Sequence, residues 1–596
     1  MTLATPPTPR MLRGGEWLIQ TVDPPDVFTP EQMSDEHHLI ARTVADFAST
    51  QVLTVLDQLE GGDWAAARRL LRRCGELGLT GVDVPHEDGG EGLDTVASMI
   101  VSERMSASAS FGATFGAQVN LTILPLSLFG TAEQKRKYLP RLMAGDLVGA
   151  YCLSEPGAGS DALGARTRAA RQADGSFLLN GEKTWITNGG FADLFIVFAK
   201  VDGEHFTAFI VERAFPGVSS GKEEHKMGLH GSSTTPVVLQ DVSVPANNVL
   251  GEIGRGHKVA FNVLNFARFK LGATCAGGAR GAIGEAARYA GQRKQFGQPI
   301  ASFGAIRHKL GEMVARAYAI ESLTYRTAGM IDARMAATPH DPIDRSAALA
   351  AFEEYAVEAS IAKVAGSEML DFVLDENIQI HGGNGFVRDY PAERHYRDAR
   401  VNRIFEGTNE INRLLISSML ARRAANGEPA LLSASGRLRN ELSAPLSPPP
   451  FDDAVTLAGE RCLVEGMKKG TLLVFGLAVQ TFGRKLADEQ EVLMQTSDMQ
   501  IDVYAAESAM LRACAAVATA TPRTMFHVDA ARVFINDAAM RLEVAARQVL
   551  PVIVQGDPLE TMRSALDRLP RVKPIDTVTM RRRLADETVT RGGYVF

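Results

Sequence analysis

The sequence predicts an α+β fold that is mainly α, in four parts. These are an N-terminal helical domain over residues 1–150, a central β domain over 151–250, a helical bundle over 251–425 and, after a Pro-rich linker at 426–450, an additional C-terminal helical domain over 451–596. Helical apolar spacing on both sides of one block of short β-type runs predicts this order. The consecutive prolines of Ser443–Pro450, which hold an extended conformation, mark the linker.

Composition narrows the class of protein. Of 596 residues, 45% are hydrophobic and 22% charged, so the chain is globular rather than disordered and long enough for about three or four domains. The net charge of −7 gives no general sign of a nucleic-acid partner. The five cysteines lack the spacing of a zinc or disulfide framework, and His225 and His230 lack a third ligand, so we expect no metal. Free thiols and the lack of a recognised signal peptide favour the cytoplasm.

The N-terminal and β domains differ in their periodicity. Trp64–Leu79 and Ala132–Met143 have helical apolar spacing, the second interrupted by Pro140. In the β domain, Asn180-Gly181 between Ser176–Leu179 and Lys183–Ile186 predicts a hairpin with a type I′ turn. Further predicted strands are Phe195–Val201, Phe206–Val211 and Pro236–Val244.

The rest of the chain is predicted to be helical. The expected helices of the bundle are Phe261–Lys294, which is rich in small residues that let helices pack closely, Ala365–His381 and Asn409–Ala424. Those of the additional domain are Asp453–Val479, Ser497–Ala520 and His527–Leu550.

Three segments carry residue types suited to a ligand. The loop Tyr151–Asp161 has two glycines that allow a backbone to approach a phosphate or ring edge, although a GxG alone is more typical of a tight turn. Trp185 and Thr187 would share one face of a strand and suit a flat heteroaromatic ligand, unless Trp185 is a core residue. Gln379–Gly385 has more glycines than one helix C-cap needs.

Glu406 is the candidate acid–base residue. It stands between Phe405 and Gly407, just before a predicted helix for which Thr408 is a suitable N-cap. On its own, this position is more typical of a surface carboxylate near a helix start.

Six motifs in this order resemble those of the acyl-CoA dehydrogenase family. They are YCLSEPGAGSD, WITNGG, MGLHGSSTTPV, YAGQRKQF, QIHGGNGF and FEGTNEI, within residues 36–425, and the helical extension resembles that of the very-long-chain subgroup. The resemblance implies FAD bound between a helical domain, a β domain and a four-helix domain. It also implies α,β-dehydrogenation of a fatty acyl-CoA to the trans-2-enoyl-CoA in fatty acid β-oxidation, with electrons passed to electron-transfer flavoprotein.

The resemblance also implies residue roles. Glu406 would take the α proton while a hydride leaves the β carbon for flavin N5; Ala267 occupies the position of the base in some members. The substrate would contact Ser160, Arg268, Glu406 and Gly407. The residues implied to bind FAD are Tyr151, Leu153, Ser154, Gly159, Ser160, Trp185, Thr187, Arg293, Gln295, Phe296, Gln379, Gly382, Gly383, Asn384, Gly385 and Thr408. Those from Arg293 to Phe296 and from Gln379 to Gly385 would reach FAD bound mainly by another subunit, which implies a homodimer.

Some expectations stay open or depart from the family pattern. Burial by Phe405 and an acyl chain would raise the pKa of Glu406, whereas the nearby helix N-terminus would lower this pKa. Gly304 and Arg307 replace glutamines that are common on the adenosine side of FAD. Thr122 and Pro125 stand where the very-long-chain subgroup tends to have glycine, which allows a shorter acyl tunnel.

Other functions are also compatible with the sequence. Acyl-CoA oxidases share the family fold, and oxygen consumption during turnover would distinguish an oxidase from a dehydrogenase. A third hypothesis is a non-catalytic scaffold protein. The intact Glu406, Trp185 and Thr187 argue against a scaffold. Thr471–Phe482 and Arg581–Arg583 suggest peripheral membrane contact through the C-terminal domain. A buried core helix and a solvated basic run explain these two segments as well.

Overall fold

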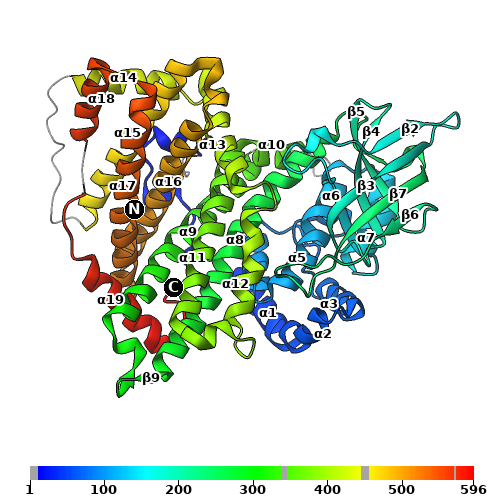
Figure 1. The fold of residues 1–596 in the computed structure, drawn as a ribbon, viewed down its shortest axis with the longest axis horizontal. Coiled ribbons are helices and arrows are strands. Elements are labelled where there is room, and N and C mark those ends of the chain that lie inside the picture. Colours follow the sequence, from blue (N-terminus) through cyan, green and yellow to red (C-terminus); the bar gives the residue numbers. More distant parts are fainter. Residues whose placement is uncertain (1–10, 338–344, 444–455, 570–571) are drawn as a thin grey trace, which may run out of the picture.

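The computed structural model describes residues 11–337, 345–443, 456–569 and 572–596. The β domain lies at one end of the molecule, the bundle in the middle and the C-terminal helices at the other end (Figure 1). The N-terminal helices, which lie beside the sheet and the bundle, are α1 Asp35–Phe47, α2 Leu56–Glu60, α3 Trp64–Glu76, α4 Thr95–Met105, α5 Ala109–Gln118, α6 Leu124–Phe129 and α7 Ala132–Met143. The predicted helix at Ala132–Met143 is confirmed with the same bounds, and Pro140 does not interrupt it.

An eight-stranded sheet forms the β domain. Its strands are β1 Gly149–Cys152, β2 Arg168–Arg171, β3 Phe177–Thr187, β4 Leu194–Val201, β5 His205–Glu212, β6 Val218–Ser220, β7 Thr234–Val244 and β8 Val249–Leu250. The order is β6-β7-β3-β2-β4-β5-β8, with β1 pairing in parallel with β4. The three strands predicted in the second half of this domain are therefore confirmed as β4, β5 and β7.

The predicted hairpin at Asn180-Gly181 is wrong. The backbone continues through both residues in the single strand β3, which pairs with β2 on one side and β7 on the other. Asn180 is used differently: its amide donates to Asp241 Oδ1 (3.0 Å), and its carbonyl oxygen accepts the Asp241 N–H (2.9 Å). The hydrogen bonds to β7 therefore override the local turn preference, and the β2–β3 turn lies upstream at Gln172–Ser176.

Long helices build the bundle. They are α8 Gly256–Gln292, α9 Gly304–Ala337, α10 Ser346–Glu354, α11 Ala356–His381, α12 Ala392–Ala399 and α13 Asn409–Ala425, with the short strands β9 Lys294–Gln295 and β10 Gln298–Pro299 between α8 and α9. The three predicted bundle helices correspond to α8, α11 and α13. Helix α9 was not predicted, because its core-facing side carries charged residues such as Glu321 and Arg326 that obscure an apolar stripe.

The C-terminal helices are α14 Leu431–Ser443, α15 Ala458–Phe482, α16 Gln490–Thr519, α17 Thr524–Ile553, α18 Asp557–Asp567 and α19 Thr577–Arg591. The three predicted helices are confirmed as α15, α16 and α17. The expectation that residues 426–450 are only a linker is wrong in part, because α14 packs against α15. The consecutive prolines 448–450 lie outside the described residues.

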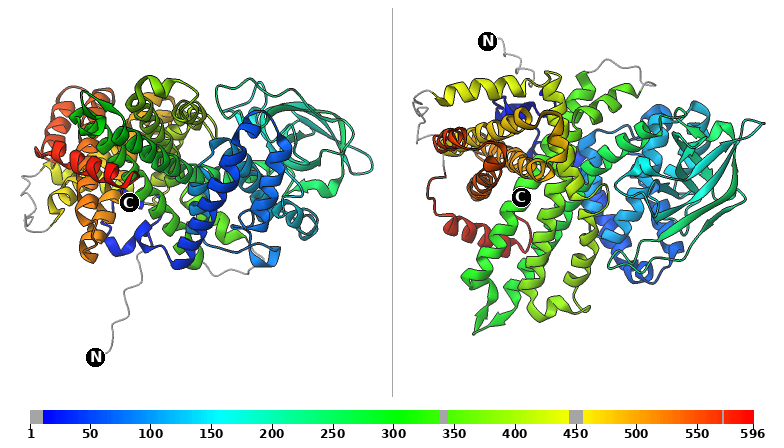
Figure 2. Two further views of the ribbon diagram at one scale, coloured as in Figure 1. Left: turned by 90° about the horizontal axis from the view of Figure 1, so that it is seen from below. Right: turned by 45° about the horizontal axis from the view of Figure 1, so that its top comes forward.

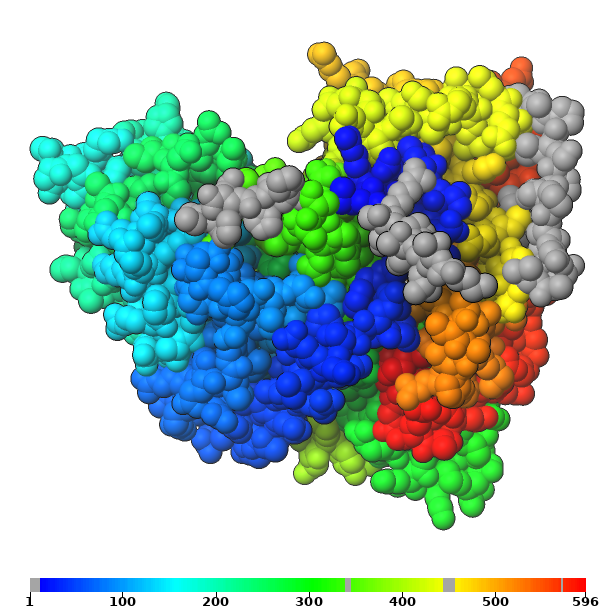
Figure 3. All heavy atoms as spheres, turned by 180° about the vertical axis from the view of Figure 1, so that it is seen from behind, coloured from blue at the N-terminus to red at the C-terminus, as the bar shows by residue number. Residues whose placement is uncertain are grey.

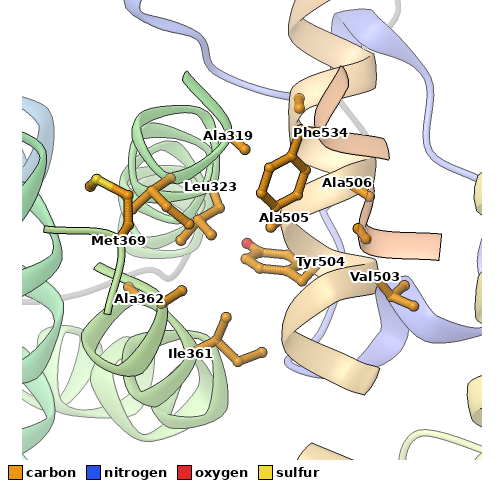
Figure 4. Packing of buried hydrophobic residues seen from close by; sticks show 14 of the residues in the cluster. Ala319, Leu323, Ile361, Ala362, Met369, Val503, Tyr504, Ala505, Ala506 and Phe534 are labelled. Atoms are coloured by element: carbon orange, nitrogen blue, oxygen red, sulfur yellow. The ribbon is translucent and has the colours of Figure 1, made fainter. Parts of the chain in front are cut away.

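The C-terminal helices and the bundle share one hydrophobic core. Figure 4 shows Leu323 of α9 facing Tyr504 of α16 and Phe534 of α17, with Met369 of α11 behind Leu323. Helix α19 returns across the molecule to pack on α9 and α8. The additional domain is therefore an extension of the bundle rather than a separately packed unit (Figure 2).

The first part of the segment before α1 packs on the bundle and the C-terminal helices rather than on the predicted N-terminal domain. Trp17 is fully buried, packs against Tyr504 with ring centroids 4.9 Å apart, and donates its indole N–H to Glu358 (2.9 Å). Lys468 of α15 donates to the Gln20 carbonyl (2.9 Å). Figure 3 shows this first segment lying against the C-terminal helices.

The apolar stretch and the basic run expected to contact a membrane do not form a common exposed surface. Thr471–Ala478, most of the apolar stretch, is buried within the shared core. In the basic run, Arg581 is buried with Glu312 and Asp537, and Arg583 pairs with Asp529. By length and composition, one described helical stretch (Asp35–Glu60, mean hydropathy 1.2) could cross a membrane, but its first helix packs against α4 as an edge helix of a globular domain does.

Candidate active site

Glu406 lies in a tight loop before α13. Its φ is +57° and that of Gly407 is +82°. A Cβ on Gly407 would lie 3.2 Å from Asn412 Nδ2, so this position favours glycine. A left-handed glutamate is uncommon and persists where surrounding contacts hold it, often at functional sites.

Three side chains hold the carbonyl groups of this loop. Arg268 Nε donates to the Glu406 carbonyl (2.8 Å), Lys363 Nζ donates to the Gly407 carbonyl (2.8 Å), and Asn412 Nδ2 donates to the Gly407 (2.8 Å) and Thr408 (3.0 Å) carbonyls. Thr408 caps α13 as predicted, since its hydroxyl accepts the Ile411 N–H (3.3 Å). The loop is therefore fixed from α8, α11 and α13 together.

Lys363 and Asn412 were missed by the sequence analysis. Lys363 is fully buried and also donates to Asn409 Oδ1 (2.6 Å). A single lysine in the small-residue, apolar stretch of α11 was a usable signal, because a buried lysine requires a partner. Asn412 had no such signal, since asparagine in the first turn of a helix is ordinary.

Burial has the largest effect on the pKa of Glu406. Glu406 Oε2 is buried and has no hydrogen-bond partner among the described residues. Burial raises the pKa of Glu406 to about 7, although the positive charges of Arg268 and Lys363 act to lower it. Burial also lowers the pKa of Lys363 to about 8. Glu406 is thus a carboxylate that exchanges a proton near neutral pH, as a general base requires.

A cavity opens at Glu406 between α5 and α8. Thr187 of β3 and Ala267 of α8 line it near Glu406. The remaining wall residues are mostly small or apolar: Ser106, Ala107, Ala109, Gly112, Ala113, Gly116, Ala117, Asn120, Leu121, Leu229, Lys270, Leu271, Thr274, Gly277, Gly278, Gly281, Ala282, Leu370, Leu374, His395, Ala399, Asn402 and Phe405. Such a lining suits a narrow apolar ligand.

The loop after β1 gathers the first group of residues implied to bind FAD. Tyr151 and Leu153 are buried, Ser154 is half-buried, and Gly159 and Ser160 are exposed. A Cβ on Gly159, or on the neighbouring Gly157, would meet no heavy atom within 4 Å. The loop therefore offers open backbone that a ligand could approach.

Glu155 anchors this loop and was also missed. Its carboxylate accepts from Lys183 Nζ (2.7 Å) and from Thr167 Oγ1 (2.5 Å) and the Arg166 N–H (2.6 Å). Burial alone would raise the pKa of Glu155, but these donors outweigh it and lower the pKa to about 2. The Glu155–Lys183 ion pair fastens the loop to β3.

Trp185 is not a core residue. Its φ is +60°, beside a bulge in β3 between Lys183 and Ile186, and it is 63% exposed. The loop after β1 runs alongside, because the Thr184 N–H donates to the Ser154 carbonyl (3.0 Å). The structure thus brings the glycine loop beside the C-terminal end of the interior strand β3, which carries Trp185 and Thr187, and Thr187 also lines the Glu406 cavity.

The second group implied to bind FAD lies elsewhere. Asn384 Nδ2 donates to the Tyr289 hydroxyl (3.0 Å), which joins the Gln379–Gly385 segment to the end of α8 beside Arg293, Gln295 and Phe296. Gln379, Gly382 and Gly383 are exposed, and Phe296 is 92% exposed. Arg268 and Arg293 are separated by most of α8, about 37 Å at a rise of about 1.5 Å per residue. Figure 2 shows β9, beside this group, far from the sheet.

The departures on the adenosine side have a structural consequence. Arg307 forms an ion pair with Asp586 of α19. Its guanidinium group therefore binds the C-terminal extension. Gly304 begins α9 without a side chain to contribute.

Comparisons with known proteins agree with this arrangement. Family models described as the acyl-CoA dehydrogenase N-terminal, middle and C-terminal domains match residues 34–146, 150–242 and 254–421, and a further acyl-CoA dehydrogenase C-terminal domain model matches 466–568. A probable acyl-CoA dehydrogenase of Bacillus subtilis (strain 168) is 44% identical over 576 residues, which is 96% of this chain and 97% of that protein. The chain belongs to the acyl-CoA dehydrogenase family.

Other family members define what is shared. The acyl-CoA dehydrogenase of Bacillus anthracis, solved in complex with FAD, superposes with a TM-score of 0.96 at 46% identity, covering 98% of this chain and 100% of that one. The human mitochondrial very long-chain specific acyl-CoA dehydrogenase is 44% identical over 353 residues, 57% of this chain and 51% of that protein. The extra C-terminal helices are thus part of a recognised acyl-CoA dehydrogenase architecture.

Proposed function

We propose that this acyl-CoA dehydrogenase converts a fatty acyl-CoA to the trans-2-enoyl-CoA, with Glu406 as the base. The observation that carries this function is the buried Glu406 Oε2, without a partner and with a pKa raised to about 7, on the wall of an apolar cavity. An α proton beside a thioester is a weak acid, so its removal needs a positioned base and polarisation of the carbonyl group. Arg268, Lys363 and Asn412 position that base through the loop carbonyls.

The residues present fit FAD as the cofactor. The open glycine loop after β1 and the exposed Trp185 beside Thr187 leave room for a flat ring and a polar chain. On one chain, FAD would be held by Tyr151, Leu153, Ser154, Gly159, Ser160, Trp185, Thr187 and Thr408. The second group of residues would contact the same FAD from the other chain. Bound FAD would supply the hydride acceptor for the β carbon.

The separation of the two FAD groups supports a homodimer. Arg293 of the second group lies about 37 Å along α8 from Arg268, which binds the Glu406 loop, and Thr187 of the first group lines the same cavity as Glu406. One chain therefore keeps the two groups apart, whereas a second copy can bring its Gln379–Gly385 segment to the first copy's Trp185 and Thr187. The large apolar side chains Phe296 and Phe386, 92% and 85% exposed, suit such an interface. We expect light scattering to give the mass of a dimer; a monomer or a tetramer would contradict this proposal.

Membership of the family supports a proposal for the cellular role. We propose that electrons pass to electron-transfer flavoprotein and that the reaction belongs to fatty acid β-oxidation in the cytoplasm. The five cysteines are free in the described structure, as a reducing compartment favours. Acyl-dependent oxygen consumption at the rate of turnover would instead identify an oxidase.

The function is tested by titrating the oxygen-free, FAD-loaded protein with fatty acyl-CoAs. We expect the oxidised flavin absorbance to bleach in proportion to the acyl-CoA added. A flavin spectrum that no fatty acyl-CoA changes would refute the proposed substrate class and favour a scaffold.

A further inference from the structure

The Glu406 cavity has a defined axis. On α8, the wall residues recur every three or four positions from Ala267 to Gly281 and Ala282. Ala267 adjoins Arg268, which binds the Glu406 carbonyl, so this end of the wall lies beside the base. Gly277 packs on the Glu103 carbonyl group at the end of α4, so the far end lies beside the start of α5.

The length of this wall can be read from helix geometry. Fourteen residue steps separate Ala267 from Gly281, about 21 Å at a rise of about 1.5 Å per residue, which is the length of an extended alkyl chain of about sixteen carbons. Helix α5 and the turn after it also line the cavity, from Ala109 to Leu121.

The two basic residues on the wall are each paired with a carboxylate. Lys270 Nζ is paired with Asp83. His395 Nδ1 lies 3.3 Å from Glu285. The far part of the wall is completed by Leu370, Leu374 and Ala282. An unsubstituted hydrocarbon therefore fits this cavity better than a chain with a polar end.

The three glycines at the far end of α8 differ in what they do. A Cβ on Gly277 would lie 2.0 Å from the Glu103 carbonyl oxygen, so Gly277 is needed for helix packing. A Cβ on Gly278 would lie 3.2 Å from Leu370. A Cβ on Gly281 would meet nothing within 4 Å, although Gly281 lines the cavity. Gly281 is exposed to this open space, which a larger side chain at the same position would partly fill.

We propose that Gly281 determines the chain-length range of this enzyme, by keeping the far end of the cavity open for straight acyl chains of about sixteen carbons. This inference rests on the proposed acyl-CoA dehydrogenation. Glycine inside a helix is less stable than alanine, and packing does not require it at position 281.

The cavity does not support the shorter acyl tunnel that Thr122 and Pro125 would allow. Neither residue is among those that line the cavity. Thr122 is buried, its hydroxyl donates to the Ala117 carbonyl (3.0 Å), and its side chain faces Gly149. The cavity extends along α8 instead, so these two positions do not limit it.

The test compares Gly281→Leu with wild type on saturated acyl-CoAs of eight and sixteen carbons, by the rate of flavin reduction at low substrate concentration. A leucine displaces about four methylenes, so we expect kcat/KM for the longer chain to fall at least about tenfold while the shorter chain keeps its rate within about twofold. Gly436→Leu is the matched control, because Gly436 is also a helical glycine with nothing within 4 Å of its Cβ, but lies on α14 outside the cavity. It should leave both rates unchanged.

The outcomes separate this inference from the function on which it rests. Equal length profiles for Gly281→Leu and wild type, or a wild type that does not use the longer chain, would overturn the role of Gly281. Wild-type flavin that neither chain reduces would refute the function itself. If Gly281→Leu loses both activities and its FAD, Gly281→Val provides the smaller side chain for the same comparison, and an unchanged profile there would also overturn the proposal.

Discussion

Glu406→Gln should lose flavin reduction by acyl-CoA while keeping FAD. Glutamine preserves the size of the side chain and the left-handed loop, but its amide cannot accept the α proton. Because general-base catalysis contributes about a hundredfold to ten-thousandfold, the rate of flavin reduction should fall by at least that factor. The measurement is anaerobic stopped-flow absorbance, with FAD content determined on the same sample.

Glu410→Gln is the matched control for this experiment. Glu410 lies four residues further on, in the first turn of α13, and is exposed. It should keep the wild-type rate within about twofold, since surface substitutions away from special features have small effects. Retained reduction in Glu406→Gln would show that another group takes the proton.

Arg512→Met should strongly destabilise the protein. Arg512 is buried in α16 and binds Glu31 (2.6 Å), from the segment before α1, and Glu321 (2.7 Å) of α9. Removing one partner of a buried ion pair leaves uncompensated charge and typically costs about 3–5 kcal/mol. We expect the free energy of unfolding to fall by about that amount. The readout is urea denaturation followed by tryptophan fluorescence, to which the buried Trp17 contributes from its place against the same helix.

Arg547→Met controls for the loss of an arginine. Arg547 is half exposed on α17 and pairs with Glu543 four residues earlier (2.7 Å). Exposed pairs of this kind contribute at most about 1 kcal/mol, so the unfolding midpoint should hardly move. Equal effects of the two substitutions would contradict the view that the buried network joins the C-terminal extension to the bundle.

The parts predictable from sequence are those determined locally. The helix at Ala132–Met143 and the Thr408 cap follow from apolar spacing and capping within a few residues. The candidate base could be located because its motif stands in order with five others. The direction of its pKa shift could not, since burial of Glu406 depends on α5, α8 and α11 packing around it.

The parts that escaped prediction depend on contacts between distant residues. Lys363 and Asn412 acquire their role only when α11 and α13 meet the Glu406 loop. Trp17 binds Glu358 of α11 across 341 positions, so nothing nearby in sequence places the first segment on the bundle. At Asn180-Gly181, the turn preference was real, but hydrogen bonds with Asp241 in β7 were stronger than the local signal.

The most direct test of the central claim, a buried carboxylate poised as a base, is the pH dependence of kcat/KM for flavin reduction by acyl-CoA. This parameter reports ionisations of the free enzyme. Since Glu406 must be ionised to accept a proton and burial raises its pKa to about 7, the rate should be low in acid and rise to a plateau above about that pH. A rate with no inflection near neutrality, or one that rises at the usual pKa of an exposed glutamate, would contradict the account.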